Sequence, residues 1–223
     1  MKIFFTALII ALTIISAQGC TFVRFKDVPD ELESAQSKSH RPIVNASPTI
    51  STRLFELDAF DEINVKIPTD IRYVVSEDGN WSAEVSAPEN YLDHIELKTE
   101  EGCLNIQFDD KGRYRSSKVC VTVFSPSLAS ARIQGAGDFM AEDGCGASEE
   151  LTLTIQGAGD VNVAGLDIER LSILIQGAGD VVASGKAEEV SVTIQGAGDV
   201  DIRSLEAGSV NSTIQGAGEI KRN

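Results

Sequence analysis

The sequence predicts an all-β protein whose C-terminal half is a parallel β-solenoid of coils about 20 residues long. The first observation is a hexapeptide, Ile-Gln-Gly-Ala-Gly-Asp, that occurs four times and is followed by a fifth copy ending in Glu (residues 133–138, 155–160, 175–180, 194–199 and 214–219). The second observation is the spacing of the copies, which start 22, 20, 19 and 20 residues apart. Near-constant spacing is typical of stacked repeats. The third observation is alternation of apolar and polar residues between the copies, which indicates half-buried strands.

Each hexapeptide predicts a sharp corner between two strands. In one repeat, residues 151–155 alternate (Leu-Thr-Leu-Thr-Ile), the glycines of the hexapeptide follow, and residues 161–163 alternate again (Val-Asn-Val). Glycine reaches backbone angles that a Cβ would forbid and lets two backbones pass close together. Each coil is therefore predicted to run strand, Gly-Ala-Gly bend, strand and loop, with strands of successive coils about 4.8 Å apart.

Stacking would align the corner side chains into two columns. The glutamines would form an amide ladder, because amides bond along a stack. The carboxylates would form a second column: Asp138, Asp160, Asp180, Asp199 and Glu219. Two interpretations of this carboxylate column stay open. Each carboxylate accepts hydrogen bonds from backbone N–H groups of its own bend, or the column is a ligand or cation site, since Ca²⁺ binds several oxygens. The calcium-binding solenoid pattern with Gly-Gly before the Asp is absent, and no other cofactor is expected.

Residues 54–130, which precede the repeats, also predict strands. Segments 63–67, 71–75, 81–85, 104–108 and 119–123 alternate or are rich in β-branched residues, with turn residues between them. Tyr73 and Trp81 share the alternation of neighbouring apolar residues, which favours core packing over a binding patch. Residues 54–223 are therefore predicted to be one domain, with a leading β half (54–130) and a five-repeat half (131–223).

The N-terminus predicts export and lipid attachment. Residues 1–19 hold one Lys and a long apolar and hydroxyl run, as a secretory signal does, and the run is short for a membrane span. The following Ser16-Ala-Gln-Gly-Cys20 resembles a bacterial lipoprotein processing box, in which Cys20 receives the lipid; an ordinary signal peptide would leave Cys20 a plain thiol. By the same resemblance, Thr21 favours the outer membrane. Residues 20–53 are polar without periodicity and predict a flexible tether.

The excess of acidic over basic residues limits the classes of partner that the protein is expected to bind. The chain has a net charge of −15, and removal of residues 1–19, which contain Lys2, leaves 18 basic and 34 acidic residues, a net charge of −16. Such a balance argues against binding of nucleic acid or anionic lipid through a basic patch. The expected partners are the membrane, through the lipid anchor, and a protein or glycan ligand.

The order of several motifs resembles a known family. These motifs are Phe60-Asp-Glu-Ile-Asn-Val65, Ala87-Pro-Glu-Asn90, Gly102-Cys-Leu-Asn-Ile106 and Val121-Thr-Val-Phe-Ser-Pro126, followed by the Gly-Ala-Gly-Asp repeats. Residues 55–220 are similar to the head GIN domain of autotransporter adhesins, found in secreted and lipid-anchored proteins of Gram-negative bacteria. The resemblance implies an all-β domain of stacked, right-handed coils and brings no catalytic motif with it.

Catalytic patterns are sparse. The histidines are His40, in the predicted tether, and His94, which is expected on the surface, and no phosphate-binding or dinucleotide motif occurs. A polysaccharide-active enzyme could use adjacent carboxylates of the column, but an acid–base pair needs two different environments and the corners are alike. We therefore expect a non-catalytic, adhesin-like envelope lipoprotein. A periplasmic assembly module that binds a partner protein is the alternative.

The remaining cysteines are Cys103, Cys120 and Cys145. An odd number in an exported protein permits one disulfide and one thiol, or no pairing. In a simple hairpin Cys103 and Cys120 would not face each other, whereas Cys145 could reach either.

Overall fold

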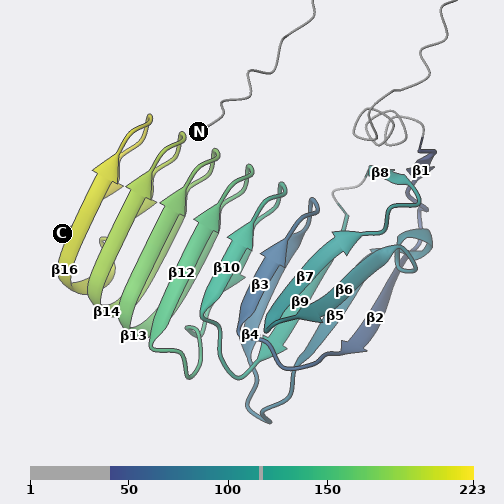
Figure 1. The fold of residues 1–223 in the computed structure, drawn as a ribbon, viewed down its shortest axis with the longest axis horizontal. Coiled ribbons are helices and arrows are strands. Elements are labelled where there is room, and N and C mark those ends of the chain that lie inside the picture. Colours follow the sequence, from purple (N-terminus) through teal and green to yellow (C-terminus); the bar gives the residue numbers. More distant parts are fainter. Residues whose placement is uncertain (1–40, 116–117) are drawn as a thin grey trace, which may run out of the picture. The chain divides into compact units, whose positions relative to one another are not determined.

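The alternating segments form the strands of one large mixed sheet (Figure 1). The computed structural model describes residues 41–115 and 118–223, and the predicted signal peptide and Cys20 lie outside these residues. Within them the one helical element is a 3₁₀ turn, η1 (Glu89–Tyr91), so the all-β prediction is confirmed. Residues 41–223 make one compact unit.

The strands of the leading half are β1 (Ile43–Asn45), β2 (Ile50–Glu56), β3 (Glu62–Val65), β4 (Asp70–Val75), β5 (Ser82–Pro88), β6 (Ile95–Glu100), β7 (Cys103–Phe108), β8 (Arg113–Arg115) and β9 (Cys120–Ser125). The strands of the repeat half are β10 (Ser130–Ile133), β11 (Phe139–Ala141), β12 (Glu150–Ile155), β13 (Val161–Ile175), β14 (Val181–Ile194), β15 (Val200–Asp201), β16 (Leu205–Ile214) and β17 (Ile220–Lys221).

The repeats stack in parallel and in register. The strand before each hexapeptide pairs with its counterpart in the next repeat, in the order β10, β12, β13, β14 and β16. The strand after each hexapeptide does the same through β11, β13, β14, β15 and β17. The first residue of every hexapeptide therefore pairs with the first residue of the next: Ile133, Ile155, Ile175, Ile194 and Ile214.

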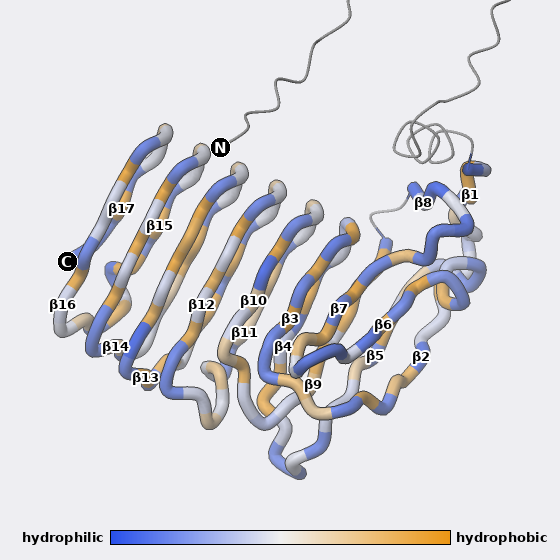
Figure 2. Tube along the Cα trace, viewed as in Figure 1, coloured by the Kyte–Doolittle hydropathy of each residue, from blue (hydrophilic) through white to orange (hydrophobic). Residues whose placement is uncertain are grey.

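The alternation buries one set of side chains between the rows of strands. Along β12 and β13, Leu153 and Ile173 are buried, and their neighbours Thr152 and Ser172 are more exposed. Figure 2 shows the same alternation as apolar and polar segments along successive strands. Burying one such aliphatic side chain contributes about 1.5–3 kcal/mol, so the repeated column of apolar residues is the main source of stability. Tyr73 is buried in this core, as its position in the alternation predicted.

The leading half contains a sixth corner that the repeat pattern did not reveal. β3 pairs with β10 and β4 pairs with β11, both in parallel. The segment between β3 and β4, Lys66-Ile-Pro-Thr69, therefore stands where later repeats have Gln-Gly-Ala-Gly, and Asp70 stands where they have the corner carboxylate. Pro68 and Thr69 in place of Ala and Gly hid this corner in the sequence.

The prediction of a parallel solenoid needs correction for the sheet as a whole. β2 pairs antiparallel with β5, β5 with β9, and β6 with β7, so the sheet is mixed. The turn between β6 and β7 explains one of these pairings: Glu101 and Gly102 have φ values of 51° and 79°. Two central residues with positive φ are the mark of a type I′ turn, which joins antiparallel strands.

The tether prediction is wrong for residues 43–53. β1 pairs with β8, and β2 pairs with β5 along seven positions from Ile50 to Glu56. The order of this segment depends on distant partners, since Ser47 N donates to Asn90 Oδ1 at 2.8 Å. Because contacts with residues far along the chain hold this polar segment, its sequence has no local periodicity from which the strands could be predicted.

Candidate functional site

The repeated corner is built around backbone contacts that only glycine permits. A Cβ on Gly157 would lie 1.7 Å from the carbonyl oxygen of Gly135, its counterpart in the preceding repeat. The second glycine is equally restricted, because a Cβ on Gly159 would lie 2.1 Å from Gly137 O. The alanine between them points outward and forms a parallel bridge from one repeat to the next. The glycines thus allow successive corners to stack directly on one another.

Each corner carboxylate bonds the backbone of the next repeat. Asp138 Oδ1 accepts a hydrogen bond from Asp160 N at 3.0 Å, and Asp160 Oδ1 accepts one from Asp180 N at 2.8 Å. The series begins at Asp70, which the sequence analysis missed, and continues through Asp180 and Asp199 to the N–H of Glu219. One of the two interpretations had each carboxylate bonding backbone N–H groups of its own bend; in the structure the bond goes to the next repeat.

The corner glutamines form the predicted amide ladder over four repeats. Gln134 Nε2 donates to Gln156 Oε1 at 2.8 Å, and the same contact links Gln156 to Gln176 and Gln176 to Gln195 at 2.9 Å. The glutamines and the corner carboxylates are exposed or partly exposed, on the outside of the stack. The outer edge of the corners is therefore a ribbon of side chains already bonded to one another or to backbone.

The bonds between repeats use only Oδ1 of each Asp in the carboxylate column, so Oδ2 can accept a hydrogen bond from another group. At the fourth hexapeptide Asp199 Oδ2 accepts a hydrogen bond from Lys221 Nζ at 2.8 Å, and this bond lowers the pKa of Asp199. In residues 41–115 and 118–223, no three His, Cys, Asp or Glu side chains are grouped so that they could hold a metal ion. Binding of Ca²⁺ or another ligand by Asp138, Asp160, Asp180, Asp199 and Glu219 stays the open second interpretation of this column.

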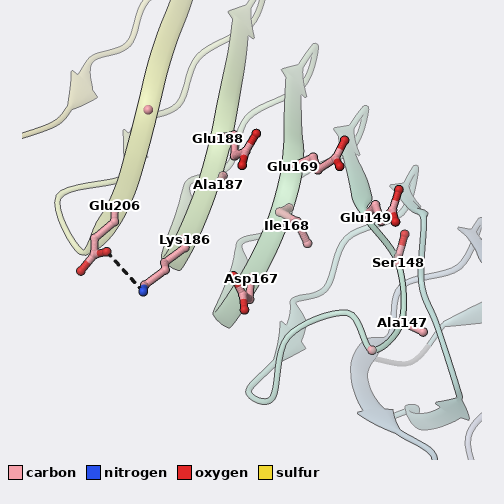
Figure 3. A pocket seen from close by; sticks show the side chains of 12 residues that line it. Ala147, Ser148, Glu149, Asp167, Ile168, Glu169, Lys186, Ala187, Glu188 and Glu206 are labelled. Carbon is pink, nitrogen blue, oxygen red and sulfur yellow. Dashed lines mark ion pairs between the residues drawn. The ribbon is translucent and has the colours of Figure 1, made fainter.

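A groove crosses the repeats on a different side of the stack from the corners (Figure 3). It has a volume of about 690 Å³ and is open to solvent. Equivalent positions of successive repeats line it, among them Glu149, Glu169 and Glu188, while Lys186 Nζ lies 3.7 Å from Glu206 Oε2 at one end. The side chains in Figure 3 project from neighbouring strands along one open face, which suits an extended partner better than an enclosed small molecule.

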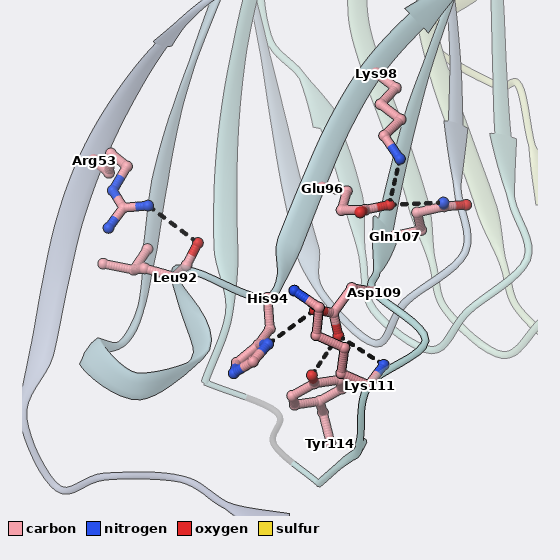
Figure 4. A network of polar contacts seen from close by, with 9 residues as sticks. All are labelled: Arg53, Leu92, His94, Glu96, Lys98, Gln107, Asp109, Lys111 and Tyr114. Carbon is pink, nitrogen blue, oxygen red and sulfur yellow. Dashed lines mark hydrogen bonds and ion pairs between the residues drawn. The ribbon is translucent and has the colours of Figure 1, made fainter. Parts of the chain in front are cut away.

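A buried carboxylate organises the opposite end of the unit (Figure 4). Asp109 accepts hydrogen bonds from the Tyr114 hydroxyl at 2.5 Å and from Lys111 N at 3.1 Å. His94 Nδ1 lies 3.0 Å from its other oxygen. Burial raises the pKa of Asp109, but the hydrogen bonds from His94 and Tyr114 outweigh burial and hold it well below the usual range. The sequence predicted His94 on the surface, and its contact with Asp109 was missed because it forms only when β6, which begins after His94, pairs with β7, which ends before Asp109.

This Asp–His pair is part of a packing cluster. The Tyr114 ring stacks on Phe108 with centroids 4.3 Å apart and contacts His94 at 5.2 Å. The hydroxyl of Tyr91 donates to Val44 O at 2.7 Å and accepts from Arg115 N at 3.1 Å, so it ties β1 and β8 to the sheet. Within the part of the chain that the structure describes, no serine or cysteine is bonded to His94, and the cluster has the connections of a structural clamp.

The three cysteines of the unit are free thiols. Cys103 pairs across the sheet with Glu62, and Cys120 pairs with Asp70 on a different row of strands. Cys145 is buried and its Sγ lies 3.8 Å from Ser148 O. Burial raises the pKa of all three thiols, which disfavours the reactive thiolate.

No helix among the described residues is both long and apolar enough to cross a membrane.

Comparison with known proteins places the chain in a family. No curated protein matches the chain. Among solved structures, a putative adhesin from Bacteroides fragilis NCTC 9343 is 20% identical, with a TM-score of 0.55 and coverage of 81% of this chain and 100% of the other. A protein from Parabacteroides distasonis ATCC 8503, described as a putative lipid binding protein, is 17% identical, with a TM-score of 0.52 and coverage of 81% and 99%.

These two structures share the fold of this chain. The family described as "Putative auto-transporter adhesin, head GIN domain" matches residues 59–223, which include the strands from β3 onward and all five repeats. The chain belongs to this head GIN domain family.

Proposed function

We propose that the protein is a non-catalytic, lipid-anchored protein of the bacterial cell envelope whose domain, residues 54–223, binds a protein or glycan partner as an adhesin does. Membership of the head GIN domain family supports an adhesin-like role. The signal-like residues 1–19 and the processing box ending at Cys20 support export and attachment to the outer membrane.

We interpret residues 131–223 as coils of a right-handed parallel β-solenoid. The parallel, in-register pairing of β10, β12, β13, β14 and β16 supports this interpretation. Right-handed connections between parallel strands are strongly preferred, which favours that hand. The antiparallel strands β2, β5 and β6 then close one end of the stack and protect it from pairing with other chains.

The groove across the repeats is the observation that carries the binding role. Its lining comes from equivalent positions of several repeats, so a partner that lies along it meets a repeated set of contacts. Repeat proteins use extended surfaces of this kind for binding. The corners are less suited to recognition, because their amides and carboxylates already bond one another or backbone.

A polysaccharide-active enzyme fits the groove less well. A catalytic acid and base need environments that move their pKa values apart. The groove carboxylates Glu149, Glu169 and Glu188 stand at equivalent positions of successive repeats and are all exposed. An exposed row of similar carboxylates supplies binding contacts without the asymmetry that acid–base catalysis requires.

Cells that display the full chain provide the test of the binding role. Cells with the wild-type chain should adhere to glycans or proteins of an array to which cells lacking the chain do not adhere. The double variant Glu169→Lys/Glu188→Lys should lose this adhesion. The control Glu77→Lys/Asp143→Lys, which changes two exposed acidic residues outside the groove, should retain it. Equal adhesion of both double variants would refute a role for the groove.

Protease treatment of intact cells separates the adhesin-like role from the alternative of a periplasmic assembly module. A surface adhesin should be degraded in intact cells, whereas a periplasmic module should be degraded only after the outer membrane is opened. Lipid attachment is tested independently by mass spectrometry of the mature N-terminus. A diacylglyceryl group on Cys20, absent from a Cys20→Ala variant, is the expected result.

A further inference from the structure

The ribbon of β1 and β8 is a basic, partly apolar face on an otherwise acidic protein. β1 pairs with β8 in parallel, so that Ile43 lies opposite Arg113 and Asn45 lies opposite Arg115. Side chains two residues apart on a strand share a face, and both arginines are exposed, while Tyr114 between them packs into the aromatic cluster. The outer face of the ribbon therefore presents two guanidinium groups beside Ile43, which is 47% exposed.

The positive charge of this face is not neutralised locally. Asp109 is bonded to Tyr114, His94 and Lys111, and Asp110 pairs with Arg41 at 2.6 Å. In the described part of the chain, the guanidinium groups of Arg113 and Arg115 take part in no hydrogen bond or ion pair. A net charge of −15 for the whole chain thus conceals a local positive surface, because the acidic residues that dominate the total lie elsewhere.

Apolar exposure is concentrated at the same end of the chain. Six large apolar side chains are exposed among the described residues, and three of them, Ile43, Ile50 and Leu54, fall within residues 43–54. Leu54 is the most exposed of the six, at 66%. Basic and apolar side chains together are the combination that favours contact with the surface of an anionic membrane.

The position of the ribbon along the chain makes a membrane the natural partner. Arg41, two residues before β1, is 21 residues from the proposed lipid attachment site at Cys20. A flexible chain of 21 residues has an end-to-end reach of roughly 25 Å. β1 is therefore the first described element that follows the anchor, and an anchored chain would hold the ribbon close to the headgroups.

We propose that the outer face of the β1–β8 ribbon, with Arg113, Arg115 and Ile43, docks on the anionic phospholipid headgroups of the membrane that carries the lipid anchor. The arginines bind the phosphates and Ile43 inserts at the boundary of the acyl chains. This proposal rests on the proposed envelope function for its location, although the docking surface itself consists of described residues. The net charge of the chain argued against binding of anionic lipid through a basic patch, and the local charge of this ribbon revises that expectation.

The test uses the chain from Thr21 to Asn223, which carries no lipid and contains the whole compact unit. Binding is measured by co-flotation with vesicles of phosphatidylethanolamine and phosphatidylglycerol at low and high salt. We expect binding to these vesicles at low salt, weaker binding at high salt, and none to phosphatidylcholine alone. In Arg113→Gln/Arg115→Gln the affinity should fall on the order of tenfold to thirtyfold, because each basic residue near an anionic surface contributes about 1 kcal/mol.

Two further variants separate the ribbon from general electrostatics. Lys66→Gln/Arg132→Gln makes the same change of charge at two exposed basic residues outside the ribbon and should bind as the wild type does. Arg113→Lys/Arg115→Lys keeps the charge and should retain most of the binding. Circular dichroism of each variant verifies that the sheet is intact.

The proposal would be overturned if the wild-type chain failed to bind anionic vesicles at low salt, or if both glutamine double variants bound equally well. It would also be overturned if the chain bound a soluble polyanion such as heparin and no vesicles. Because the chain in this assay carries no lipid, the result is independent of whether Cys20 is acylated. Failure of lipid attachment appears only in the mass spectrum, so the two proposals fail separately.

Discussion

Asp160 Oδ1 accepts a hydrogen bond from the backbone N–H of Asp180, 2.8 Å away and one repeat further along the stack. The same bond recurs from Asp70 to the N–H of Glu219, so each Asp of the series, from Asp70 to Asp199, joins its corner to the next one. A residue type that repeats with a fixed period suggests a row of binding groups. In this protein the row bonds backbone N–H groups, as one interpretation of the sequence had it, but the N–H groups belong to the next repeat and not to the same bend.

Replacement of Asp160 should separate its role as an acceptor from its charge. Asp160→Ala removes the acceptor of Asp180 N–H and should lower the free energy of unfolding by about 1 kcal/mol. Asp160→Asn keeps an acceptor oxygen and removes one charge from the column, so its stability should equal or slightly exceed that of the wild type. Urea unfolding measures both, with Asp143→Ala as a control at an exposed carboxylate outside the column. Equal losses for the alanine and asparagine variants would contradict this account.

The glycine of the corner should be intolerant of even one added methyl group. Gly157→Ala would place a Cβ 1.7 Å from Gly135 O, which is rigid backbone, so the repeats must separate locally. We expect a loss of about 3 kcal/mol or more in the free energy of unfolding, at the upper end of overpacking effects. Ala158→Ser, at the adjacent exposed position, is the control and should change stability little. A fully stable Gly157→Ala protein would show that the corners do not stack as described.

The Asp109 cluster predicts a specific loss of stability in acid. Because the pKa of Asp109 is lowered in the folded protein, its ionised form stabilises the fold above the unfolded value of about 3.9, and this contribution disappears as the pH falls through the folded value. Tyr114→Phe removes the 2.5 Å hydrogen bond and keeps the ring, so it should cost about 1–3 kcal/mol near neutral pH.

The measurement for this cluster is the free energy of unfolding of wild type and Tyr114→Phe between neutral pH and acid. The difference between the two proteins should shrink as Asp109 becomes protonated. Asp109→Asn, which cannot ionise, should show a flatter dependence on pH than the wild type. A constant difference between wild type and Tyr114→Phe across the whole range would mean that the hydroxyl does not stabilise the carboxylate.

The three thiols should differ in reactivity. The chain from Thr21 contains Cys103, Cys120 and Cys145, all free in the structure. With a maleimide, Cys120 should react first because it is exposed, and Cys145 should react last because it is buried and burial raises its pKa. Mass spectrometry should count three labels after denaturation without reductant. Fewer than three would reveal a disulfide and a different arrangement of these strands.

The sequence predicted those parts of the fold that repeat. The hexapeptides hold their spacing and their alternation, so the pairing of Ile155 with Ile175 follows from the sequence alone. The corner at Asp70 was not predicted, because Pro68 and Thr69 interrupt the Gly-Ala-Gly pattern, although the sequence alternates on both sides of it. The Glu101–Gly102 turn lacks the Asn-Gly or Asp-Gly pair that signals a two-residue hairpin, so the antiparallel pairing of β6 and β7 became evident only from its positive φ values.

Other features were beyond prediction from local pattern. β1 is held by the Tyr91 hydroxyl, 47 residues away along the chain from Val44, and such a contact leaves no periodicity in the sequence. The groove across the repeats was also not predicted, because its lining residues come from the loop before β12 and from within β13, β14 and β16, between the hexapeptides, where the repeats differ in sequence. The position of each carboxylate was predictable, but its bonding partner depended on how closely the glycines let the corners approach.

We infer that the repeated corners hold the stack together, and we propose that recognition takes place elsewhere on the domain. Thermal unfolding of the chain from Thr21, first with EDTA and then with millimolar Ca²⁺, tests this claim most directly. We predict no change of Tm with Ca²⁺, in the wild type or in Asp160→Asn and Asp180→Asn. A ligand that binds the native state raises stability by RT ln(1 + [L]/Kd). A rise of several degrees with Ca²⁺ in the wild type, absent from both variants, would contradict the account and make the carboxylate column a cation site.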